Sequence, residues 1–214
     1  MFSSLYLKMN FISKNFKNSH KLVSIDIFDT LLFRLVDTPE SLFPILGTRA
    51  GELGLLHHSF TPNEFALLRI SAEKEARKIQ RIKNGHTEVT LTEIYQLLPS
   101  STGNKAKLAD LELRLECEHC FLNQEILEFI NLAHSQEVPI VLTSDMYLSK
   151  TQLLRILRFN KFDVNIIKEI YVSCEYKCNK VSGNLFGLQR AGMSGFSFGN
   201  LPGATKAANF FKAK

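Results

Sequence analysis

The sequence predicts an α/β fold in which a parallel sheet carries a helical insertion after its first strand. Two short apolar runs indicate buried strands. Residues 22–27 include Asp26 near their carboxyl end, and residues 138–143 are followed by Ser144. Strands of a parallel sheet are covered on both faces and are therefore almost continuously apolar. Between the two runs, apolar residues recur at helical spacing from residue 35 to residue 136.

Helix-start signals divide this insertion into several helices. Residues 61–64 (Thr-Pro-Asn-Glu) combine a capping box with proline at the first helical position, and residues 90–93 (Thr-Leu-Thr-Glu) repeat the capping signature. Residues 39–56 are expected to form one helix or two short ones. Further helices are predicted through residues 108–115 and from Asn123 onward.

The sequence after the second strand continues the alternation of helices and strands. Residues 149–152 (Ser-Lys-Thr-Gln) cap another helix, a third strand is expected at 170–173, and a fourth at 196–199, before a Gly-Asn-Leu-Pro-Gly loop. Strands that alternate with helices favour a parallel sheet with right-handed crossovers.

The composition fits one globular domain of this kind with an inserted cap. The chain has 214 residues, of which 45% are hydrophobic, enough to bury a core. The predicted division is an N-terminal extension (1–20), an α/β core (21–34 and 137–214) and a helical cap (35–136). The formal charge of +5 comes from 26 basic and 21 acidic residues that are scattered along the chain, so we expect no nucleic-acid partner.

Residues 1–20 mix apolar residues with lysines and contain no acidic residue. A basic amphipathic helix for a membrane surface and a transit-like segment are two interpretations, and a packed or frayed extension is the favoured one. No apolar stretch reaches transmembrane length or forms a secretory signal. We therefore expect a cytoplasmic protein.

The four cysteines occur as a C-x-x-C pair, Cys117 and Cys120, and a C-x-x-x-C pair, Cys174 and Cys178. Such spacing raises the alternative of a zinc site. Because the first pair falls within a helical pattern and no secretory signal is found, reduced thiols are the favoured interpretation.

Residues 24–31 (Ser-Ile-Asp-Ile-Phe-Asp-Thr-Leu) resemble the first motif of the haloacid dehalogenase (HAD) superfamily of hydrolases, which have a Rossmann-like core. The resemblance implies that Asp26 is a covalent nucleophile and that the Thr30 hydroxyl binds the transferred group. Phosphatases of the superfamily carry a general acid and base two residues after the nucleophile, where this chain has Phe28. Adjacent strand residues face opposite ways, so Asp29 replaces that acid only if the turn has already begun.

Two further motifs match in the expected order. Ser144 matches the second motif, whose hydroxyl donates to the bound group, and Lys180 matches the third, with Lys177 as the alternative. A cation is needed there because a carboxylate nucleophile and an anionic substrate repel each other. The residues of the first two motifs resemble those of an uncharacterised branch of the superfamily that has a helical cap inserted after the first strand.

The fourth motif departs from the superfamily pattern. Metal-dependent members bind Mg²⁺ through the nucleophile and two acids after the fourth strand. Here Asn200 stands where the first acid belongs, and Gly203 or Thr205 where the second belongs. The resemblance therefore implies Mg²⁺ held weakly by Asp26 and Asn200, with Asp29 or Asp145 as further oxygen donors.

Three functional hypotheses remain open. The first is phosphomonoester hydrolysis of a small phosphorylated metabolite through an aspartyl-phosphate on Asp26. The second is a metal-free hydrolase similar to the 2-haloacid dehalogenases, which also have an aromatic residue two after the nucleophile and an Asn in the fourth motif. Such an enzyme needs an arginine for the substrate carboxylate, and the candidates are Arg34, Arg49 and Arg69. The third is a catalytically inactive domain.

The inactive-domain hypothesis rests on the end of the sequence. Nine residues follow Thr205, where a superfamily core normally continues through another helix and strand. We expect the C-terminal part of the core to be truncated, as a frameshift or premature stop would leave it. A missing strand exposes the edge of the sheet to pairing with another chain, so either a homo-oligomer or poor solubility is expected.

Overall fold

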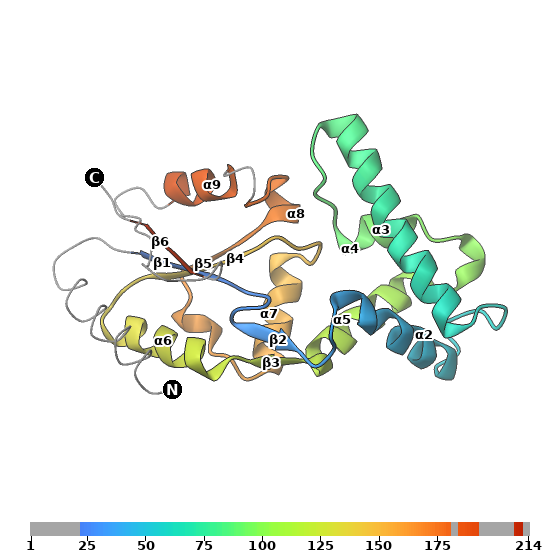
Figure 1. The fold of residues 1–214 in the computed structure, drawn as a ribbon, viewed down its shortest axis with the longest axis horizontal. Coiled ribbons are helices and arrows are strands. Elements are labelled where there is room, and N and C mark those ends of the chain that lie inside the picture. The colour runs from blue at the N-terminus through green and yellow to red at the C-terminus, as the bar shows by residue number, and fades with distance from the viewer. Residues whose placement is uncertain (1–21, 181–183, 193–207, 212–214) are drawn as a thin grey trace.

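The computed structural model describes residues 22–180, 184–192 and 208–211 (Figure 1). Within these ranges the chain forms a four-stranded sheet in the order β5-β4-β1-β6. Three strands run parallel, and the fourth pairs with β1 in the antiparallel sense. The strands are β1 (Leu22–Asp26), β4 (Ile140–Ser144), β5 (Glu169–Val172) and β6 (Ala208–Phe211).

The predicted α/β fold with a parallel sheet is confirmed. The second and third strands lie within two residues of the ranges expected from the apolar runs. β4 is buried along its whole length, and β1 is buried up to Asp26, which is half-buried at its end. Continuous burial is the reason why both strands are apolar throughout.

Helices cover both faces of the sheet. Figure 1 shows α8 (Ser173–Tyr176) and α9 (Asn184–Gly192) on one face, and α6 (Gln124–Ser135) and α7 (Lys150–Phe159) on the other. The Ser149 hydroxyl accepts a hydrogen bond from the Gln152 backbone, which confirms the predicted capping box of α7. The 3-10 turn η3 (Val164–Ile166) joins α7 to β5.

A second group of helices lies beside the sheet rather than on it (Figure 1). Both predicted capping boxes are confirmed, because Thr61 and Thr90 cap α3 and α4. The region expected as one helix or two short ones forms a 3-10 turn followed by a helix that ends at Glu52. These elements are η1 (Pro39–Ser41), α2 (Leu42–Glu52), α3 (Pro62–Asn84), α4 (Leu91–Gln96), η2 (Ser100–Thr102) and α5 (Lys105–His119).

A short two-stranded ribbon joins the two groups of elements. β2 (Leu32–Arg34) pairs antiparallel with β3 (Cys120–Leu122), so the chain leaves the sheet and returns to it side by side. The expectation of helix almost throughout this region was wrong at β3. A strand of three residues whose partner is far away in the sequence has no periodic signal of its own.

The predicted division into core and cap stays a proposal. α6 belongs to the predicted cap range 35–136, yet it contacts β4 and lies against the sheet (Figure 1). We therefore propose a cap that ends with α5, and a core that resumes at β3.

Several predictions lie outside the described residues: the extension 1–20, the fourth strand at 196–199, and Asn200, Gly203 and Thr205 of the fourth motif. In the part of the chain that the structure describes, no helix combines the length and the apolar character needed to cross a membrane.

Candidate active site

The carboxyl ends of β1 and β4 bring the first two motifs together. In the register of these parallel strands, Asp26 lies opposite Thr143, and Ser144 follows directly. The Ser144 side chain and Thr30, in the turn after β1, are both buried. The Asn123 amide donates a hydrogen bond of 3.0 Å to the Thr30 carbonyl oxygen and so fixes this turn. Both hydroxyl-bearing residues therefore lie at the carboxyl ends of the parallel strands, where ligands bind in open α/β folds.

Lys180, rather than Lys177, lies at Asp26. The Lys180 ammonium is 2.7 Å from the Asp26 Oδ1 atom, and both side chains are about a quarter exposed, at 23% and 25%. Lys177 instead adopts a left-handed backbone conformation with φ of 56° and lies 3.9 Å from the carboxylate of Glu93 in the cap. The structure thus pairs the predicted nucleophile with the predicted cation.

Burial raises the pKa of the Asp26 carboxyl above its usual value. The Lys180 ammonium and a hydrogen bond from the Ile27 backbone act in the opposite direction, and the negative charge of Asp29 adds to the rise. Desolvation disfavours the charged form of a carboxyl, and a nearby cation favours it. Lys180 is therefore the main group that keeps Asp26 available as an ionised carboxylate.

The Asp145 carboxylate binds the backbone of Lys180. The Lys180 backbone N–H lies 3.0 and 3.1 Å from the two carboxylate oxygens of Asp145. Burial raises the pKa of Asp145, and the charges of Glu88 and Asp26 raise it further, whereas the contacts with Lys180 lower it. The two carboxylates of Asp26 and Asp145 thus share one lysine.

The residue at the position of the missing acid is packed under an arginine. The Arg34 guanidinium carbon lies 4.1 Å from the centre of the Phe28 ring. The same guanidinium donates hydrogen bonds of 3.1 and 3.2 Å to the two carboxylate oxygens of Glu116. Phe28 is therefore in cation–π contact with an arginine that is itself fixed by its ion pair with Glu116.

The turn after β1 has already begun at Asp29. Its φ of 58° is in the left-handed region, which Asp tolerates better than most residues. The strand alternation that would turn Asp29 away from the site therefore no longer applies. Asp29 lines the same cleft as Phe28.

This cleft lies between the sheet edge and the cap and encloses about 330 Å³. The core contributes residues from the turn after β1 and from the segment after Ser144. The cap contributes residues from η1, α2 and α3. Its lining combines apolar and charged side chains, which suits a small polar ligand. The lining residues are Phe28, Asp29, Arg34, Pro39, Glu40, Phe43, Ile70, Glu73, Lys74, Arg77, Asp145, Met146 and Tyr147.

The three candidate arginines for a substrate carboxylate have different surroundings. Arg34 lines the cleft, whereas Arg49 forms an exposed ion pair with Glu52 at the end of α2. Arg69 is fully buried and bound to Glu112 inside the cap. Arg34 is therefore the candidate placed to meet a ligand in the cleft.

The described residues do not complete a metal site. Among them, no group of three or more His, Cys, Asp and Glu side chains is close enough to hold a metal ion. Asp26 and Asp145 supply carboxylates, but Asn200 lies outside the described ranges.

All four cysteines are free thiols, and burial raises the pKa of each, that of Cys174 to about 12.

Replacing Lys180 by Met is expected to raise the pKa of Asp26 further. A carboxyl with a folded pKa above its unfolded value binds more protons in the folded state, so stability falls as pH rises from the ordinary Asp value through the raised one. The variant should therefore lose stability relative to the wild type as pH increases across this window, and any turnover should fall roughly 100-fold. Urea unfolding at pH 4 and pH 8 measures the first effect.

The control is Lys78→Met, which removes an exposed lysine 3.5 Å from Glu75 on α3. Equal pH dependence in the two lysine variants would contradict the assignment of Lys180 as the group that keeps Asp26 charged.

A HAD-hydrolase and a dehalogenase are among the solved structures to which this chain is similar. YfnB from Bacillus subtilis, named as a candidate HAD-hydrolase and solved bound to magnesium, has a TM-score of 0.52 at 15% identity and covers 85% of this chain and 78% of its own. The L-2-haloacid dehalogenase from Xanthobacter autotrophicus has a TM-score of 0.49 at 10% identity, with 84% and 78% covered. No protein-family model and no curated protein matches the sequence.

Proposed function

Because the chain has the HAD-like hydrolase fold, we propose that it hydrolyses the phosphate monoester of a small metabolite through an aspartyl-phosphate on Asp26. The observation that carries this proposal is the ion pair of 2.7 Å between Asp26 and Lys180 at the carboxyl end of β1. A carboxylate in this position is a nucleophile that burial would protonate and Lys180 keeps charged. Asp29 and Asp145 line the nearby cleft, whereas Asp26 and Lys180 are not among its lining residues; we propose that the substrate enters through this cleft.

In the proposed reaction, an oxygen of Asp26 forms a bond to phosphorus while the bond from phosphorus to the leaving oxygen breaks. Lys180 offsets the negative charge of the nucleophile and the phosphoryl group. The hydroxyls of Thr30 and Ser144 donate to phosphoryl oxygens, as the resemblance implies. Water then cleaves the aspartyl-phosphate, and this regenerates Asp26 and releases inorganic phosphate.

The proton for the leaving oxygen is assigned to Asp29. Phe28 has no proton to give, and Asp29 is the next carboxyl along the turn. It lines the cleft and lies three residues after Asp26 in the chain, and in its protonated form it would donate to the leaving oxygen. A general acid must lie within reach of the leaving group.

Replacing Asp29 by Asn is expected to slow hydrolysis of an alkyl phosphate roughly 100-fold, because its leaving oxygen needs a proton. An aryl phosphate, whose leaving group is already a weak base, should be affected much less. The kcat values of both substrates measure this difference, with Asp37→Asn as an exposed control. An equal loss on both substrates would argue against Asp29 as the acid.

Mg²⁺ would neutralise phosphoryl charge if it binds, and Asp26 and Asn200 are the proposed donors. The described residues by themselves do not form that site. Phosphate release with and without Mg²⁺ measures whether the reaction requires the ion.

The test is phosphate release from p-nitrophenyl phosphate by the purified protein, with and without Mg²⁺, beside the Asp26→Asn variant. We expect release that the variant loses. Release that continues unchanged in the variant would place the chemistry elsewhere, and no release in either protein would favour one of the two other hypotheses.

A second candidate function is metal-free dehalogenation of a small 2-haloacid, and the position of Arg34 favours it. This guanidinium lines the cleft beside Phe28, where it is placed to meet a substrate carboxylate. Its hydrogen bonds to Glu116 leave it already paired, which weakens this candidate. Halide release from 2-chloropropionate in the presence of a chelator separates it from the first proposal.

A further inference from the structure

Residues 85–93 comprise the loop after α3 and the first three residues of α4, and they bridge from the cap to the core; we call them the cap strap. The strap begins at Gly85, whose φ of 73° ends α3. It contacts both core segments that border the site. The Leu91 backbone N–H donates a hydrogen bond of 2.9 Å to the Tyr147 carbonyl oxygen, and Glu93 is 3.9 Å from Lys177. The strap is therefore one of the places where the cap touches the core, and it contacts the segments that carry Asp145 and Lys180.

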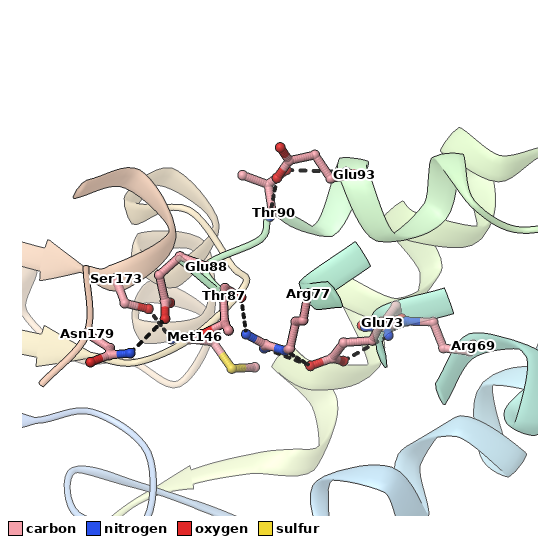
Figure 2. A network of polar contacts seen from close by, with 11 residues as sticks. Arg69, Glu73, Arg77, Thr87, Glu88, Thr90, Glu93, Met146, Ser173 and Asn179 are labelled. Atoms are coloured by element: carbon pink, nitrogen blue, oxygen red, sulfur yellow. Dashed lines mark hydrogen bonds and ion pairs between the residues drawn. The ribbon is translucent and has the colours of Figure 1, made fainter. Parts of the chain in front are cut away.

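The cap holds the strap through a chain of charged contacts (Figure 2). Arg69, buried in the cap, is 3.0 Å from Glu73, and Glu73 receives two hydrogen bonds of 2.7 and 3.0 Å from Arg77. Arg77 then donates a hydrogen bond of 3.0 Å to the carbonyl oxygen of Thr87 in the strap. The backbone immediately before Glu88 is thus fixed from the cap side.

Glu88 makes the contact on the core side. The Asn179 amide donates a hydrogen bond of 3.3 Å to the Glu88 Oε1 atom, and Figure 2 shows the two side chains facing each other. Glu88 is only 5% exposed. A buried carboxylate loses its hydration, so a specific partner is needed to retain it in this position.

Asn179 directly precedes Lys180, and both ends of Lys180 are engaged in the site. Its backbone N–H binds Asp145 and its ammonium binds Asp26. A displacement of Asn179 therefore moves the cation that keeps the nucleophile ionised. The charge of Glu88 also raises the pKa of Asp145, which places Glu88 close to the same group of residues.

We propose that Glu88 is a positioning residue that holds Lys180 against Asp26 through its hydrogen bond with Asn179. The cap thereby fixes the catalytic lysine of the core, in addition to lining the cleft. This inference rests on the proposed function only in giving Lys180 a catalytic role; the placement of Lys180 is testable without turnover.

The first readout is the reactivity of the Lys180 amine toward acetic anhydride, followed by mass spectrometry. An ammonium held against a carboxylate reacts slowly, so Asp26→Asn gives the fully released reference. We expect Glu88→Ala to raise the labelling of Lys180 about fivefold, the equivalent of one lost hydrogen bond. Glu88→Gln keeps an oxygen acceptor for Asn179 and should label as the wild type does.

The matched control is Glu75→Ala, which removes an exposed carboxylate on α3 whose ion-pair partner is Lys78 of the same helix. Asn179→Ala removes the same hydrogen bond from the core side and should reproduce the effect of Glu88→Ala, and the double variant should add little. This second route decides the case if Glu88→Ala fails to fold.

The second readout is turnover. Glu88→Ala should lower kcat roughly tenfold with KM little changed, because a misplaced catalytic group affects the chemical step, and Glu88→Gln should restore it. Labelling of Lys180 in Glu88→Ala or Asn179→Ala at the rate of the Glu75→Ala control would overturn the proposal. If the wild type has no phosphatase activity but labelling follows the expected pattern, the positioning stands and the proposed function fails.

Discussion

Replacing Asp26 by Asn is expected to lower turnover by roughly 1,000-fold or more while the protein stays folded, because an amide forms no aspartyl-phosphate and the loss of a nucleophile is among the largest catalytic effects known. Asn has almost the shape of Asp, and β1 is buried and paired on both sides. The initial rate of phosphate release measures the loss.

The stability of this variant separates a chemical effect from a structural one. Burial raises the pKa of Asp26, so the folded state pays for its ionisation at neutral pH, and the neutral amide removes that penalty. The substitution also removes the carboxylate that pairs with Lys180, which lowers stability. We therefore expect the two effects to offset each other in the melting temperature. Asp37→Asn, at an exposed position, is the matched control, and a large drop in melting temperature would attribute the lost activity to misfolding instead.

The features predicted correctly from the sequence are those with a local signal. The strand that ends at Asp26 has its apolar run, and the helices capped by Thr61, Thr90 and Ser149 have capping boxes, which the structure confirms bond for bond. Such signals lie within a few neighbouring residues, where backbone hydrogen bonding dictates the residue type.

The features that the sequence did not reveal depend on pairs that are distant along the chain. β2 and β3 pair although the whole cap separates them in the sequence. Likewise, Arg34 forms an ion pair with Glu116, and Glu88 accepts a hydrogen bond from Asn179. An isolated Glu in a polar segment has no pattern that distinguishes it from a solvated one. Arg69 illustrates the same limit: the sequence presents it as a candidate for a substrate carboxylate, and the structure buries it in an ion pair.

Arg69 is also the site of the largest expected effect on stability. Its guanidinium donates hydrogen bonds of 2.7 and 2.8 Å to both carboxylate oxygens of Glu112, and neither side chain is exposed. The Tyr95 hydroxyl donates a further hydrogen bond of 2.6 Å to Glu112. The arginine also lies over the rings of Phe43 and Tyr147, at 4.7 and 4.9 Å, so it joins the cap to the segment after Ser144.

Replacing Arg69 by Ala is expected to lower the free energy of unfolding by about 3–5 kcal/mol, because it leaves the Glu112 carboxylate buried without a cation. Urea unfolding followed by circular dichroism measures the change. Arg49→Ala is the control, since its ion pair with Glu52 is more than half exposed and is worth at most about 1 kcal/mol.

The double variant Arg69→Met with Glu112→Leu separates the two contributions to this cost. Removing both charges should recover part of the lost stability, since a well-packed apolar pair replaces a buried ion pair with little penalty. Recovery should stay incomplete, because the Tyr95 hydroxyl loses its acceptor. If the double variant is as unstable as Arg69→Ala, the packing of the arginine between Phe43 and Tyr147 carries the stability, and the ion pair with Glu112 is not its source.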